Sequence, residues 1–253
     1  MNLQATVDVA RGFRSPSQVA RVITENWCRT ELYCLACEGD ELAPERANSR
    51  ACDFTCQNCT ERYELKSGKG WSRERIIDSG YAAMVGAIRA DRTPNLLIMQ
   101  YSENWFVRNL LLIPRYFLAE SIIEKRTPLG PLARRAGWIG CNILLKGIPH
   151  EGKIGIVESG IESDHTEVRE KFCRAKSLQS LSVTDRGWTV DVLSAVHSIG
   201  HQQFSLGDAY SFEEQLSRLH PNNRHVRAKI RQQLQVLRDL GFLRFLGGGQ
   251  YSF

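Results

Sequence analysis

The chain has 253 residues, of which 42% are hydrophobic and 24% are charged, and its formal net charge at pH 7 is +5. This composition is that of a folded globular protein, and the length allows one large domain or two modest ones. No apolar run approaches the roughly eighteen residues that a membrane span needs, and the N-terminus lacks a secretory signal pattern. We therefore expect a protein of the bacterial cytoplasm with no membrane partner.

The first predicted element is a helix that begins after Ser15. Ser15 is a suitable N-cap, and Gln18 completes the pattern of a capping box. Apolar residues then recur at helical spacing as far as Trp27. A cysteine-rich hairpin is predicted over residues 33–67, followed by a helix over residues 72–90.

The middle of the chain contains three short apolar runs that predict strands. They cover residues 95–101, 106–113 and 153–158. After about residue 180 three helical patterns follow one another, and a hairpin turned by three glycines closes the chain. The predicted helices cover residues 187–199, 206–219 and 223–240, and the strands residues 243–246 and 250–253. This is the layout of a winged helix, so we expect domains at 1–180 and 181–253.

Four of the eight cysteines form two pairs with the spacing of a metal site. Cys34-x2-Cys37 and Cys56-x2-Cys59 are separated by eighteen residues. That arrangement is typical of a zinc site with four thiolate ligands, which leaves no open position for a substrate and is therefore structural. The alternative is a set of buried free cysteines, the interpretation that we favour for Cys28, Cys52, Cys141 and Cys173.

A candidate catalytic motif lies beside the second cysteine pair. Residues 62–66 alternate as a strand does, which places Glu64 and Lys66 on one face. If residues 51–55 form the facing strand, Asp53 reaches the same face. Two carboxylates can hold Mg²⁺, and a neighbouring lysine can orient the attacking water or neutralise a phosphate. The alternative is a solvated strand face without chemistry.

The predicted helix at residues 223–240 has the pattern of a DNA-reading helix. Its apolar side carries Val226, Ile230, Leu234 and Leu237. The opposite arc carries Arg224, His225, Ala228, Arg231, Gln232 and Gln235. Five Arg or Lys residues and no acid lie between Pro221 and Arg238. Cations suit phosphates and glutamine suits an adenine edge, so we expect Arg224, His225, Arg231 and Gln232 to contact DNA; a basic solvated face is the alternative.

Three segments together resemble a known family. The strings CDFTCQNCTERYELKSGKG (52–70), TPLGPLARRAGWIGCNI (127–143) and KIRQQLQVLRD (229–239) are similar to the methyl-directed restriction endonucleases that cut adenine-methylated GATC. The resemblance runs over most of the chain. It implies an α/β nuclease core of PD-(D/E)xK type with a zinc knuckle, followed by a C-terminal winged helix. A cysteine, Cys52, stands where the generic motif has proline before its aspartate.

The resemblance also implies roles for individual residues. Asp53 and Glu64 would be Mg²⁺ ligands, and Lys66 the third catalytic residue. The zinc ligands would be Cys34, Cys37, Cys56 and Cys59. In isolation Trp138 would be read as a core residue, but the resemblance favours contact with DNA at the methylated site. An apolar indole suits two clustered N6-methyl groups, and Arg134 and Arg135 would lie on phosphates.

The sequence therefore predicts a Mg²⁺-dependent type II endonuclease that hydrolyses double-stranded DNA at GATC carrying N6-methyladenine. We expect a monomer, since no coiled-coil heptad makes a dimer necessary. One alternative is a non-catalytic regulator that binds DNA through its zinc knuckle and winged helix. Another is a repair nuclease of the same fold that recognises structure or damage.

Overall fold

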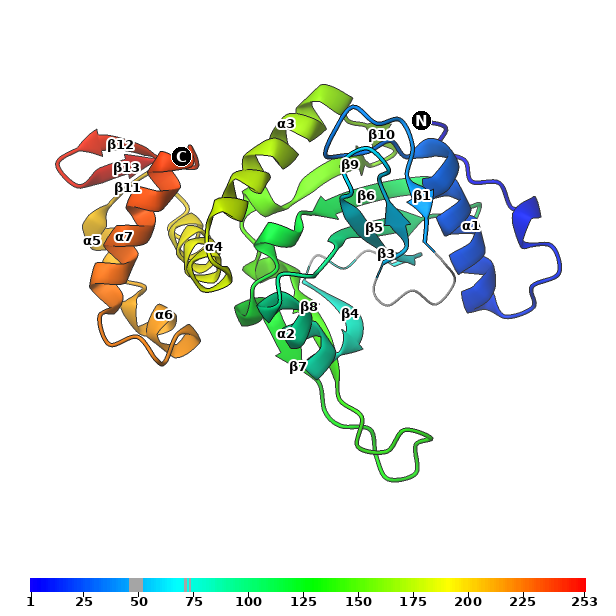
Figure 1. Cartoon of the computed structure of the whole chain (residues 1–253), viewed down its shortest axis with the longest axis horizontal. Coiled ribbons are helices and arrows are strands. Elements are labelled where there is room, and N and C mark those ends of the chain that lie inside the picture. Colours follow the sequence, from blue (N-terminus) through cyan, green and yellow to red (C-terminus); the bar gives the residue numbers. More distant parts are fainter. Residues whose placement is uncertain (46–51, 71, 73) are drawn as a thin grey trace. The chain divides into compact units, whose positions relative to one another are not determined.

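The structure is a computed structural model that describes residues 1–45, 52–70, 72 and 74–253 (Figure 1). The chain separates into two compact units, each assembled from segments that are distant in sequence. The first unit comprises Met1–Ser72, Thr93–Arg115 and Glu151–Ala175, and the second comprises Arg73–Arg92, Tyr116–His150 and Lys176–Phe253. Every helix of the described residues is too short or too polar to span a membrane.

A mixed sheet forms the centre of the first unit. Among the described residues it has seven strands in the order β1-β2-β3-β5-β6-β9-β10. Their bounds are β1 Ala43–Pro44, β2 Phe54–Thr55, β3 Arg62–Gly68, β5 Asn95–Tyr101, β6 Val107–Ile113, β9 Ile154–Glu158 and β10 Ile161–Glu162. Strands β3 and β5 pair in parallel, and the other neighbours pair antiparallel. The three strands predicted between residues 95 and 158 are confirmed.

Two α-helices accompany this sheet, α1 (Pro16–Glu31) and α3 (His165–Lys176). Helix α1 is attached to β3 by a hydrogen bond of 3.0 Å between the hydroxyls of Thr24 and Ser67. The predicted capping box is wrong, because the Ser15 hydroxyl bonds to that of Ser17 at 3.0 Å and caps no backbone amide. Helix α3 was not predicted, since its few buried apolar residues are surrounded by charged ones.

The second unit begins with a correction to the predicted helix at residues 72–90. Its first part is a strand, β4 (Arg75–Gly80), and only α2 (Tyr81–Arg89) is helical. The β-branched residues of β4 favour a strand, which pairs antiparallel with β8 (Gly140–Leu144). Strand β8 in turn pairs with β7 (Ile123–Lys125), and the three form a separate sheet of order β4-β8-β7.

The C-terminal part of the second unit has the elements of a winged helix. They are α4 (Val183–His197), β11 (Gln203–Ser205), α5 (Leu206–Tyr210), α6 (Glu213–Leu219), α7 (Val226–Asp239), β12 (Arg244–Gly247) and β13 (Gln250–Ser252). The strands form a sheet of order β11-β13-β12. Thr189 of α4 donates to Gln233 of α7 at 2.6 Å inside the core. The single helix predicted at 206–219 is two helices, because a capping box at Ser205 starts a short α5 that ends before α6.

Six short 3-10 helices complete the described secondary structure. They are η1 (Asp8–Ala10), η2 (Arg115–Phe117), η3 (Glu120–Ile122), η4 (Leu145–Gly147), η5 (His150–Gly152) and η6 (Ser177–Ser180). Segment η6 leads from α3 into α4, whose N-cap Ser182 accepts from the backbone amide of Asp185. A polar cap of this kind gives α4 a defined start.

Candidate functional site

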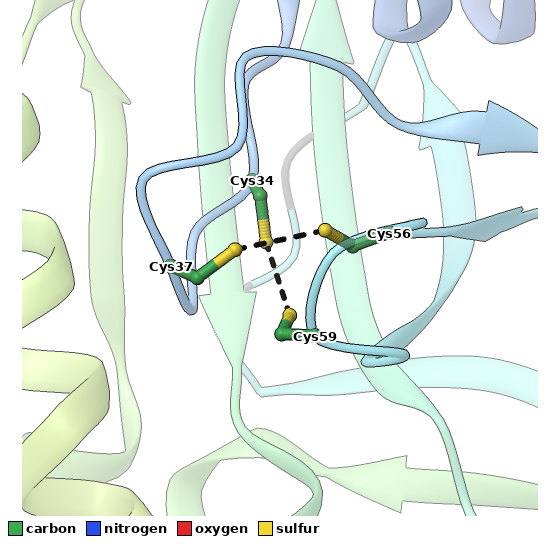
Figure 2. A group of neighbouring side chains, drawn as sticks. All are labelled: Cys34, Cys37, Cys56 and Cys59. Atoms are coloured by element: carbon green, nitrogen blue, oxygen red, sulfur yellow. Dashed lines mark hydrogen bonds between the residues drawn. The ribbon is translucent and has the colours of Figure 1, made fainter.

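The four paired cysteines lie together in the first unit, as the spacing predicted (Figure 2). Their Sγ atoms are all within 4.8 Å of one another, and all four thiols are free. The Sγ distances are 3.6 Å from Cys34 to Cys59 and 3.7 Å from Cys37 to Cys56. Tetrahedral zinc with Zn–S bonds of about 2.3 Å places its sulfurs about 3.8 Å apart. The cluster therefore fits a structural zinc ion.

Backbone groups support the sulfurs of the first cysteine pair. The amide N–H of Ala36 donates to Cys34 Sγ, and that of Gly39 donates to Cys37 Sγ, each at 3.4 Å. A Cβ on Gly39 would lie 3.0 Å from the side chain of Asn58 and 3.4 Å from two of the sulfurs. Glycine at this position therefore lets the two knuckles approach closely.

The pKa values of the cluster thiols are shifted in different directions. Burial raises the pKa of Cys34 and of Cys59. Burial also acts to raise the pKa of Cys56, but backbone N–H groups of Cys59 and Asn58 and neighbouring thiols lower it to about 7. A divalent cation that binds here replaces the thiol protons.

The predicted catalytic residues lie on the β2–β3 hairpin of the same unit. Oδ2 of Asp53 accepts from the amide N–H of Leu65 at 2.7 Å, and the Asp53 amide donates to the Tyr63 carbonyl at 2.8 Å. Nζ of Lys66 donates to Oε1 of Glu64 at 2.5 Å, and these side chains are 26% and 14% exposed. The three side chains thus gather around one stretch of β3.

The hairpin differs in one detail from the prediction of a facing strand at residues 51–55. Strand β2 contains only Phe54 and Thr55, which pair with Tyr63 and Arg62. Asp53 directly precedes the strand, and residue 51 lies outside the described residues. The hydroxyl of Tyr63 lies 3.5 Å from Cys34 Sγ, so β3 connects the catalytic candidates to the cysteine cluster.

One acidic residue near this hairpin was not predicted. Burial raises the pKa of Glu25 on α1, Arg21 lowers it, and Asp53 raises it further. Burial likewise raises the pKa of Cys28, one turn along the helix, with contributions from Asp53 and Glu25. Glu25 therefore lies within electrostatic reach of Asp53. The available signal was an acid beside the apolar stripe of α1, but one sequence gives no means of pairing it with Asp53.

Helix α7 in the second unit presents the two faces that its sequence predicts. The residues expected in the core, Val226, Ile230, Leu234 and Leu237, are buried. The residues expected to face DNA are exposed, namely Arg224, His225, Ala228, Arg231, Gln232 and Gln235. Arg227 pairs with Glu213 and Lys229 with Asp185. Within the described chain no carboxylate pairs with Arg224 or Arg231, so both cations are available to a polyanion.

The remaining predicted DNA contacts lie in the loop between β7 and β8. Arg134 and Arg135 are exposed, and the Arg135 guanidinium lies 4.5 Å from the centre of the Trp138 ring. Trp138 is half-buried, and a Cβ on Gly140 would lie 2.9 Å from its ring. One part of the indole is therefore packed against glycine backbone, while a cation covers another.

Together, a mixed-sheet unit with a four-cysteine cluster and a helix-turn-helix region with an exposed cationic helix define a DNA-acting protein. A comparison with family models agrees. The model of the Dam-replacing family (DpnI) matches residues 1–181, and that of the Dam-replacing HTH domain matches residues 184–252. The chain belongs to the Dam-replacing family. Membership implies a methylation-dependent restriction endonuclease, which confirms the family resemblance and the predicted fold class.

Proposed function

We propose that the protein is a Mg²⁺-dependent, type II endonuclease that hydrolyses double-stranded DNA at GATC carrying N6-methyladenine. The observation that carries this proposal is the geometry of the β2–β3 hairpin. Asp53 is fixed by the amide of Leu65, while Glu64 and Lys66 are in contact on the same strand. We further propose that it acts as a monomer, with a nuclease domain at 1–180 and a winged helix at 181–253.

The donor set of this hairpin suits Mg²⁺, which prefers carboxylate oxygens. Asp53 and Glu64 would hold the ion, with Asp53 oriented by its bond from the Leu65 amide. When bound, Mg²⁺ would polarise the scissile phosphate and lower the pKa of a bound water. The cysteine cluster would hold Zn²⁺ as a structural ion that fixes the turn of the hairpin.

Lys66, two residues after Glu64 on β3, would have two roles in catalysis. Its ammonium orients Glu64 through their hydrogen bond, and it can stabilise the negative charge that develops on the phosphate. In hydrolysis the water oxygen bonds to phosphorus as the bond to the leaving sugar oxygen breaks. The water gives up a proton and the leaving oxygen takes one up.

We propose that the nuclease domain and the winged helix both contribute to recognition of the methylated site. Trp138 would contact the methyl groups, and Arg134 and Arg135 would bind phosphates. Arg224, His225, Arg231 and Gln232 would contact DNA from the winged helix. Arg135 covers part of Trp138 in the free protein, so it would move from the indole onto a phosphate on binding. Full retention of methyl preference by Trp138→Ala would contradict this role.

The test is plasmid cleavage with Mg²⁺, using one plasmid prepared with and without adenine methylation at GATC. We expect cutting of the methylated plasmid alone, and loss of cutting in Asp53→Ala and Lys66→Ala. Equal cutting of both plasmids would contradict the methyl specificity and favour a repair nuclease. Tight DNA binding without cutting would favour a non-catalytic regulator.

A further inference from the structure

The loop between β7 and β8 projects from its sheet and carries an exposed leucine near its tip. Figure 1 shows this loop, residues 126–139, extending away from the β7–β8 hairpin. Leu132 near its tip is 101% exposed, more than any other large apolar side chain of the described residues. A leucine in this state is solvated on all sides, so it gains apolar contact only from another molecule.

The loop is held in shape by its own backbone, so Leu132 does not fold back onto the protein. At the base, the Arg126 amide donates to the Gly140 carbonyl at 3.0 Å, and the Leu129 amide donates to the Trp138 carbonyl at 2.9 Å. The tip is a series of tight turns with amide–carbonyl bonds of 3.0 Å from Ala133 to Gly130, from Ala136 to Ala133 and from Trp138 to Arg135. The exposed position of Leu132 is thus built into the loop.

The charge of the loop selects the kind of partner. Residues 125–140 contain four Lys or Arg residues and no Asp or Glu. Arg134 and Arg135 directly follow the tip and are exposed. An apolar tip flanked by cations is complementary to duplex DNA, where phosphates border a groove whose floor is formed by the bases. DNA is also the partner that the family implies.

We propose that Leu132 is an apolar wedge that inserts between base pairs of the bound duplex, with Arg134 and Arg135 on the bordering phosphates. This inference rests on the proposed function and adds to it a residue that deforms the DNA. Unstacking a base step is unfavourable, and the contact of an otherwise solvated side chain with the exposed base faces offsets it. The free energy gained depends on an apolar side chain of sufficient length at position 132.

The test measures base stacking in the complex and does not depend on cleavage. A set of methylated GATC duplexes carries 2-aminopurine, paired with thymine, at one position each directly beside the site, so that both N6-methyladenines are kept, and is bound in Ca²⁺ in place of Mg²⁺. Because 2-aminopurine fluoresces more strongly when unstacked, wild-type protein should raise the signal about severalfold at one step. Leu132→Ala should lose that rise and bind the duplex about tenfold more weakly. Leu132→Met should retain most of both effects.

A matched control is Ile161→Ala, because Ile161 is a 72% exposed apolar residue of β10, outside the loop. It should behave as the wild type does. The proposal is overturned if wild-type protein raises the signal at no position, or if Leu132→Ala keeps the full rise. Failure of the proposed function would instead be seen in the wild-type plasmid assay, as cutting that ignores methylation.

Discussion

The ammonium of Lys66 lies 2.5 Å from a carboxylate oxygen of Glu64, two residues before it on β3. This contact joins the cation to one of the two proposed Mg²⁺ ligands. Lys66 is 26% exposed, so solvent or a phosphate can still reach it. A substitution that removes the charge of Lys66 therefore tests whether this lysine acts on the phosphate.

We expect Lys66→Met to lower the cleavage rate by about 10²-fold or more, because it removes the charge that we propose stabilises the transition state. DNA affinity, measured by fluorescence anisotropy in Ca²⁺, should change little. Lys69→Met is the matched control, since Lys69 is an exposed lysine of the same segment that pairs with Glu103. Equal loss of rate in both variants would contradict a specific role for Lys66.

Removal of the proposed zinc should loosen the β2–β3 hairpin, which carries the proposed catalytic residues. We expect Cys37→Ser, or dialysis against a strong chelator, to lower Tm by about 10 °C and to abolish cleavage. Elemental analysis of wild-type protein should give about one zinc per chain. Cys173→Ser is the control, because Cys173 is exposed and lies outside the cluster. A metal-free wild type with full activity would contradict the structural role of zinc.

Glu25 should influence metal binding at the hairpin, because its negative charge interacts with that of Asp53. We expect Glu25→Gln to raise the Mg²⁺ concentration for half-maximal cleavage by about three- to tenfold, as one anionic group is lost from the site. Calorimetric titration with Mn²⁺ would report the same change without catalysis. Arg21→Gln removes the cation that pairs with Glu25 at 3.6 Å and should shift the requirement in the opposite direction.

On helix α7, Arg231 and Arg227 form a matched pair for testing DNA contact. Both are exposed, but Arg227 is paired with Glu213 at 2.6 Å, whereas Arg231 lies on the arc predicted to face DNA. We expect Arg231→Ala to weaken DNA binding and to reduce the slope of log K against log salt by about one. Arg227→Ala should leave the slope nearly unchanged. A larger effect at Arg227 would place the DNA on a different side of the helix.

The ion pair between Asp185 and Lys229 should make winged-helix stability depend on pH. Hydrogen bonds from Lys229 and Ser182 hold the pKa of Asp185 below its usual value of 3.8. A carboxyl with a lowered native pKa contributes stability above its unfolded pKa, and this contribution disappears as pH falls through the native value. Asp185→Asn should therefore cost about 1 kcal/mol of unfolding free energy at pH 7, since the pair is partly exposed.

Urea unfolding at several pH values would measure this dependence. The difference between wild type and Asp185→Asn should shrink steadily below pH 3.8. Asp239→Asn is the control, because Asp239 is exposed and pairs only with its chain neighbour Arg238 among the described ion pairs. A difference that stays constant down to the acid transition would show that Asp185 acts through packing.

Two parts of the structure followed directly from local patterns in the sequence. The apolar stripe of α7 is buried as its period predicted, because a helix that covers a core must repeat its apolar residues at 3.6-residue spacing. The four cysteines meet because two CxxC pairs at knuckle spacing are typical of a zinc site with four thiolate ligands. The apolar period of α7 involves residues that are close in the chain, and the cysteine site is marked by a CxxC motif that occurs twice.

Other parts depend on partners that are distant in the chain. Strand β4 was wrongly predicted as part of a helix. It is stabilised by pairing with β8, which joins Ile76 to Ile143, and a local sequence pattern does not reveal a partner so distant in the chain. The electrostatic interaction of Glu25 with Asp53 requires α1 to pack on β3, which the bond between Thr24 and Ser67 secures. The exposure of Leu132 is equally invisible in sequence, where Pro-Leu-Ala resembles any apolar stretch.

The four cysteines of the cluster and all three proposed catalytic residues lie in the single stretch from Cys34 to Lys66. If the cluster holds zinc, oxidation of its thiolates would disturb the hairpin that carries the proposed catalytic residues. An oxidant that accepts two electrons from two thiolates of the cluster would join them in a disulfide and leave only two sulfurs for zinc. A reductant would restore the four ligands, and zinc could then bind again. Redox conditions during purification would thus decide how much of the protein has an ordered catalytic hairpin.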